Sequence, residues 1–173
     1  ISENSIMKGK KLMNKHISVK LIVINAMIAS IYAALTLVIS PIAYSEIQFR
    51  LSEIMVFLAF YNRKYIPGLI IGCIVANLFS PMGLLDVIFG TISTIIVCIS
   101  MYLIKNRYLA AIIGALITGI IIGGELWYAY QIPYLINALY VAIGELIVLI
   151  IGAFIFNILE HNNRFMNIFI DHI

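Results

Sequence analysis

Long apolar runs separated by short polar breaks make up most of this chain, and this pattern predicts a series of membrane-spanning helices. A helix that crosses the hydrocarbon core of a bilayer needs about 20 predominantly apolar residues. The predicted spanning segments are residues 19–40, 48–61, 65–79, 84–104, 109–128 and 133–159. We therefore expect an all-α membrane protein with six transmembrane helices, in which residues 18–160 form the membrane domain.

Polar segments flank this membrane domain. Residues 1–17 are polar and basic, and we leave them out of the fold prediction because the chain begins with isoleucine rather than methionine. Residues 161–173 form a carboxyl-terminal tail. The first apolar run is too long for a cleavable signal peptide, and no convincing small-residue cleavage site follows it, so we expect it to be retained.

The second predicted segment is shorter than the others. Arg50 on one side and the pair Arg63 and Lys64 on the other leave only 12 residues between charges. Twelve residues of α-helix measure about 18 Å. Such a segment spans a bilayer poorly unless its outer end lies in a cavity of the protein.

Composition agrees with a membrane protein and excludes several other classes. The chain has 173 residues, of which 63% are hydrophobic and 11% charged, whereas soluble domains have about 25% charged residues. A soluble enzyme, a disulfide scaffold and a disordered chain are therefore excluded. Cys73 and Cys98 lie in apolar runs and are interpreted as packing residues. No room remains for a separate soluble domain, so any energy source must lie on another chain.

The distribution of Lys and Arg predicts the orientation of the helices. Ten of the 11 basic residues fall on the side of the membrane that also holds both termini, and only Arg50 falls on the other side. Basic residues favour the cytoplasmic side of membrane proteins. We therefore expect a multi-pass protein of the plasma membrane with both termini in the cytoplasm.

Four acidic residues lie within the apolar segments, where an ionisable group costs a few kcal/mol, on the order of 2.5–3.5 on insertion scales. Three of them are predicted near the outer surface and Glu145 lies deeper. Asn137 and Glu145 share one helix face because they are two helical turns apart. The predicted cluster is acid-rich and faces outward, with one internal cation; its members are Glu53, Asp86, Glu125, Glu145, Gln48, Arg50, Asn77, Asn137 and Trp127.

Several of these residues also have a purely structural interpretation. Arg50 can pair with Glu53 three residues later, and Asp86 is placed to cap the first turn of its helix. Trp127 is typical of the aromatic belt at a membrane interface. Glu145 has neither explanation, and we interpret it as a ligand contact or a proton carrier.

Small residues recur at four-residue spacing in three of the predicted helices. Gly68 and Gly72, like Gly119 and Gly123, favour close packing within the bundle. In the first helix the pattern is Ala29-x-x-x-Ala33. This pattern is consistent either with internal packing or with docking of a partner membrane protein, and its spacing does not separate the two.

Missing sequence motifs exclude other activities. The chain has no Walker A motif, so we expect no ATP hydrolysis by this chain. All three histidines lie outside the apolar segments, which argues against an intramembrane metalloprotease or a Ser-His protease. No basic stripe with interleaved aromatic residues is present, so nucleic acid is not an expected partner. We expect neither an enzyme nor a cofactor or metal site.

Three stretches of the sequence resemble the QueT family. They are Ile-Gln-Phe-Arg-Leu-Ser-Glu at 47–53, Ile-Pro-Gly-Leu-Ile-Ile-Gly-Cys at 66–73 with Ala-Asn-Leu at 76–78, and Gly-Leu-Leu-Asp-Val-Ile-Phe-Gly at 83–90. The resemblance extends over about residues 20–159 and is densest between 48 and 90. Members of this family are substrate-binding membrane subunits, called S components, of energy-coupling factor (ECF) transporters. The resemblance implies a six-helix S-component bundle with both termini in the cytoplasm.

The resemblance also implies a ligand and partners. The ligand would be a queuosine precursor, 7-aminomethyl-7-deazaguanine, with queuine as the close alternative. Glu53, Asp86, Glu125 and Glu145 would provide acidic contacts, with Arg50 orienting Glu53. A donor such as Gln48, Asn77 or Asn137 would bind the ring carbonyl, and the flat ring would lie against Trp127 or a tyrosine. Ala29 and Ala33 would dock on the transmembrane EcfT subunit, which carries two ATPase subunits.

Three alternatives remain open from the residues alone. The first is a stand-alone proton-coupled carrier that uses Glu125 and Glu145 as a proton relay. The second is a structural subunit of a larger membrane complex. The third is an S component for another vitamin-type ligand, because one fold can serve different substrates.

Overall fold

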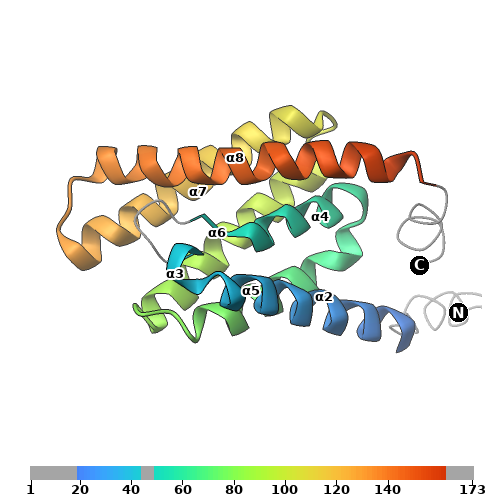
Figure 1. The fold of residues 1–173 in the computed structure, drawn as a ribbon, viewed down its shortest axis with the longest axis horizontal. Helices are drawn as coiled ribbons and strands as arrows, with labels where there is room; N and C mark the ends of the chain where they lie inside the picture. The colour runs from blue at the N-terminus through green and yellow to red at the C-terminus, as the bar shows by residue number, and fades with distance from the viewer. Residues whose placement is uncertain (1–18, 44–48, 163–173) are drawn as a thin grey trace, which may run out of the picture.

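The computed structural model describes residues 19–43 and 49–162, and every regular element within those ranges is helical (Figure 1). The predicted all-α fold is therefore confirmed. The elements, in chain order, are α2 (Val19–Val38), α3 (Ser40–Ala43), η1 (Leu51–Val56), α4 (Phe57–Tyr61), η2 (Arg63–Tyr65), α5 (Ile66–Asn77), α6 (Leu84–Leu103), α7 (Arg107–Tyr130) and α8 (Tyr134–Glu160).

Four of these helices, rather than the predicted six, are long and apolar enough to cross a membrane: α2, α6, α7 and α8. The prediction was wrong for the segments at 48–61 and 65–79. The first becomes the short pair η1 and α4, and the second becomes α5, a helix of 12 residues that measures about 18 Å. The polar residues between these two segments form a turn. A hydrogen bond from the backbone N–H of Lys64 to the Asn62 side chain stabilises this turn.

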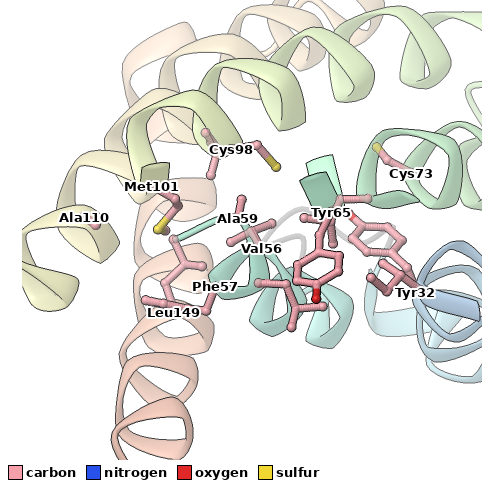
Figure 2. Close-up of a cluster of buried hydrophobic side chains, with 14 of the residues drawn as sticks. Tyr32, Val56, Phe57, Ala59, Tyr65, Cys73, Cys98, Met101, Ala110 and Leu149 are labelled. Carbon is pink, nitrogen blue, oxygen red and sulfur yellow. The ribbon is translucent and has the colours of Figure 1, made fainter. Parts of the chain in front are cut away.

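The short segment η1–α4 is enclosed by other parts of the bundle. Val56, Phe57 and Ala59 are completely buried. Figure 2 shows them among side chains from other helices, including Tyr32 of α2, Met101 of α6 and Leu149 of α8. A short helix lacks the length to cross the hydrocarbon core, but it is tolerated at membrane depth when protein surrounds it.

The small-residue faces of α5 and α7 pack inside the bundle, as predicted. A Cβ atom on Gly72 of α5 would lie 2.7 Å from Cβ of Tyr32 in α2. A Cβ atom on Gly123 of α7 would lie 2.6 Å from Cα of Ala138 in α8. These glycines therefore allow two pairs of helices to approach closely. Cys73 and Cys98 are buried, free thiols, in agreement with the packing role expected for them.

The two ends of the bundle carry different connections. The start of α2, the end of α8 and the α6–α7 connection lie at one end, which we call the terminal end (Figure 1). The α5–α6 turn and the α7–α8 connection lie at the opposite end, which we call the loop end. The acidic residues predicted to form a site are distributed from the loop end toward the middle of the bundle.

Candidate functional site

Helix register brings three distant polar residues to the same level near the loop end. In the antiparallel pair α6 and α7, the hydroxyl groups of Ser93 and Thr118 lie 3.4 Å apart. Asp86 lies seven residues before Ser93, and Glu125 lies seven residues after Thr118, so the two carboxyl groups occupy one level. Glu125 is within electrostatic range of Asp86.

Asn137 of α8 joins this level. Gly123 packs on Ala138 across the α7–α8 interface, which places Glu125 beside the first turn of α8. Glu125 is completely buried, and Asn137 is 3% exposed. We call Asp86, Glu125 and Asn137 the outer level of the site.

Arg50 and Asn77 adjoin the outer level. The Nη2 atom of Arg50 lies 3.7 Å from Oδ1 of Asp86, and the Ser80 hydroxyl donates a hydrogen bond to Oδ2 of the same carboxylate. Asn77 donates its amide N–H to the backbone carbonyl of Asp86 at 2.9 Å. A Cβ atom on Gly90 would lie 2.3 Å from Nδ2 of Asn77, so glycine is required there for this arrangement.

Glu53 and Glu145 form a second, deeper level, which we call the inner level. Glu145 follows Asn137 by eight residues, which is about 12 Å along α8. Glu145 is within electrostatic range of both Glu53 and Arg50. The hydroxyl of Tyr32 on α2 donates a hydrogen bond to Oε1 of Glu53. Both carboxyl groups are buried, and Glu145 is 1% exposed.

Buried polar atoms at both levels lack a hydrogen-bond partner among the residues that the structure describes. Leaving a buried donor or acceptor without a partner costs about 1–3 kcal/mol, and more for a charged group. Such a concentration of unpartnered polar atoms makes these two levels the candidate site for a polar ligand. The atoms are Oε1 and Oε2 of Glu125, Nδ2 of Asn137, Oδ1 of Asn77, Oδ1 of Asp86 and Oε1 of Glu145.

These free atoms determine which chemical groups the site can bind. A carboxylate with two free oxygens accepts a pair of N–H donors side by side, and the free amide N–H of Asn137 can donate to a carbonyl. Among the described residues, no group of three or more His, Cys, Asp and Glu is placed to hold a metal ion. The arrangement is therefore suited to an organic ligand with several N–H donors.

From the sequence, Arg50 could be explained as the partner of Glu53, and Asp86 as a helix cap. The structure gives both residues further contacts that the sequence did not suggest. Arg50 forms an ion pair with Asp86 of α6. The residue that precedes the first turn of α6 is Gly83, no side chain caps that turn, and the Asp86 side chain accepts a hydrogen bond from Ser80. Sequence reasoning missed Tyr32 and Ser80 because neither is charged; their only signal is that a hydroxyl group in an apolar helix or turn needs a partner.

Trp127 lies away from the buried carboxylates. It follows Glu125 by two residues, which turns it about 200° around α7, and 51% of its surface is exposed. It lines an apolar groove of about 740 Å³ on the outside of the bundle, together with Phe89, Ile92, Ile120, Ile121, Gly124, Tyr128 and Tyr134. Gln48 lies outside the described residues, so its predicted contact with the ligand stays a prediction.

The small residues of α2 fall on two faces. Ala29 and Ala33 are buried, 8% and 7% exposed. The Cβ position of Gly72 lies 3.0 Å from the carbonyl oxygen of Ala29, so this face contacts α5. The outer surface of α2 carries a different set of small residues at the same spacing, namely Ala26, Ser30 and Ala34.

Comparison with known proteins identifies the family. The family model described as QueT transporter matches residues 22–161. The chain is 35% identical over 150 residues to the queuosine precursor transporter QueT of Lactococcus lactis subsp. cremoris (strain MG1363), an alignment that covers 78% of this chain and 88% of that protein. No solved structure matches the chain. With four apolar helices long enough to span a membrane and a family match over most of its length, this chain belongs to the QueT transporter family.

Proposed function

We propose that this chain is the substrate-binding S component of an ECF-type transporter and that it imports a queuosine precursor. The family match and the name of the Lactococcus relative support this substrate class. The observation that carries the proposal is the outer level, where Glu125 and Asn137 are buried with free hydrogen-bonding atoms. A protein without a ligand for these groups would gain stability by replacing them with apolar side chains.

The ligand we favour is 7-aminomethyl-7-deazaguanine, with queuine as the close alternative. The edge of a guanine-like ring presents two adjacent N–H donors, which match the two free oxygens of Glu125. The neighbouring ring carbonyl can accept from the amide of Asn137. The aminomethyl group is cationic, and it suits a site in which four buried carboxyl groups lie within electrostatic range of one arginine: Glu53, Asp86, Glu125 and Glu145, with Arg50.

We place the loop end of the bundle outside the cell and both termini in the cytoplasm. The basic residues Lys20, Arg63, Lys64, Lys105 and Arg107 belong to elements or connections at the terminal end, which supports this orientation through the positive-inside rule. The loaded chain would then reorient in the plasma membrane and release its ligand inward, driven by two ATPase subunits through the EcfT subunit.

Binding by the purified chain tests the substrate. Titration calorimetry with 7-aminomethyl-7-deazaguanine should show one site per chain. Glu125→Gln should weaken binding about tenfold to a hundredfold, because one charge-assisted pair of hydrogen bonds of about 1.5–3 kcal/mol is lost. Glu160→Gln at the terminal end is the matched control and should bind normally. Failure of the wild-type chain to bind any 7-deazaguanine would refute the proposal.

The outer face of α2 is the surface we propose for docking on EcfT, since Ala29 and Ala33 are buried inside the bundle and Ala29 lies against α5. Ser30→Leu should leave ligand binding intact and abolish ATP-dependent uptake in vesicles that contain the complete transporter. Ala29→Leu should lower both, because the larger side chain would push α5 away. Equal loss of binding and uptake in Ser30→Leu would show that this face is structural.

A further inference from the structure

The inner level holds a carboxyl group whose burial the surrounding chain does not explain. Glu145 is 1% exposed, and its Oε1 atom has no hydrogen-bond partner within the described parts of the chain. The charged groups that act on it are Glu53 and Arg50. One of these is a second carboxyl group, which repels the Glu145 carboxylate, and the other is an arginine, which attracts it.

The inner level has little positive charge of its own, because Arg50 interacts with carboxyl groups at both levels. Arg50 lies 3.7 Å from Asp86 at the outer level, while Glu53 receives its hydrogen bond from the neutral hydroxyl of Tyr32. A carboxyl pair of this kind is stabilised by a cation placed between its members. The free oxygen of Glu145 provides one direct acceptor for such a cation.

The two levels are spaced for one small ligand. About 12 Å of helix separates Asn137 from Glu145. Val141, midway between them on the same face of α8, is completely buried in an apolar cluster with Ile122 and Leu126, so the surroundings between the two levels are apolar. A bicyclic ring with a one-carbon arm, held by a hydrogen bond of about 2.9 Å at each end, has a comparable length.

We infer that Glu145, together with Glu53, binds the cationic arm of the ligand and thereby selects a charged precursor over a neutral one with the same ring. The ring edge lies on Glu125 and Asn137 at the outer level, and the arm points toward the middle of the bundle. This assignment rests on the proposed function, and it gives Glu125 and Glu145 different roles.

Two ligands that share a ring but differ in the arm test this assignment. 7-Aminomethyl-7-deazaguanine carries an ammonium group, and 7-cyano-7-deazaguanine carries a neutral nitrile. The wild-type chain should bind the aminomethyl base about tenfold to a hundredfold more tightly, the range expected for a buried charge-assisted contact. Glu145→Gln should remove this preference and leave binding of the cyano base within about twofold of wild type.

Matched variants keep the test decisive. Glu125→Gln should weaken both bases by the same factor, so that the preference survives. Glu145→Asp keeps the charge and should retain most of the preference, and thermal unfolding of each variant in detergent shows whether it folds. Equal weakening of both bases by Glu145→Gln in a folded protein would overturn the inference, as would an unchanged preference. If the wild-type chain binds neither base, the proposed function itself fails.

Discussion

Charged side chains are partly or fully buried at both ends of the bundle, but they are arranged differently. At the terminal end, Arg107 of α7 forms an ion pair with Glu160 of α8, and the Tyr61 hydroxyl lies 3.5 Å from the same carboxylate oxygen. Here one positive and one negative charge meet directly. At the loop end, the buried Glu125 carboxyl group faces a second carboxyl group, that of Asp86, and among the described residues no N–H or O–H donor pairs with either of its oxygens.

This difference is the one expected between a structural contact and a proposed binding site. An ion pair at the end of a bundle can connect two helices, and each of its charged groups then has a partner within the protein. A buried carboxyl group with free oxygens makes the protein less stable until something binds to it. The charge balance and the free hydrogen-bonding atoms, rather than the presence of charge alone, are therefore our grounds for proposing the binding site at the loop end.

The largest effect is expected from Gly90, which lies against the outer level. Gly90→Ala should weaken ligand binding by about a hundredfold or more, because the added methyl group would lie 2.3 Å from Nδ2 of Asn77 and displace that side chain. Titration calorimetry measures the change. Gly124→Ala is the matched control, since its nearest neighbour would be 3.9 Å away, and it should bind normally. Normal binding by Gly90→Ala would show that Asn77 is not needed at the site.

A smaller effect is expected at the terminal end. Glu160→Gln should reduce the free energy of unfolding by less than about 1 kcal/mol, the usual range for a partly exposed ion pair, and should leave ligand affinity unchanged. Thermal unfolding with and without the ligand measures both quantities. A substantial loss of affinity would mean that the two ends of the bundle are coupled and would contradict the structural interpretation of this ion pair.

The smallest effect is expected from Trp127, which lines the apolar groove on the outside of the bundle. Trp127→Leu should change ligand affinity by less than about twofold, because this side chain points away from Glu125. Intrinsic fluorescence adds a second readout, since Trp127 is the one tryptophan in the chain. A tenfold loss of affinity would instead place the ring of the ligand against Trp127.

Local patterns in the sequence determined much of this picture. The apolar runs predicted an all-α membrane protein, and helical spacing placed Asn137 and Glu145 on one face of α8, where the structure buries both. The glycine spacings of α5 and α7 also identified internal packing faces. These inferences succeeded because each depends on residues within a single helix, where geometry follows directly from the chain.

Contacts between distant segments required the tertiary structure. Tyr32 bonds to Glu53 across 21 residues, and η1–α4 is buried by helices far away in the sequence. Helical periodicity shows that Ala29 and Ala33 share a face, as do Ala26 and Ser30, but it does not show which face α5 will cover. The packing of helices decides which side chains gain a partner and which remain free, and a side chain's chemistry in the membrane depends on that partner.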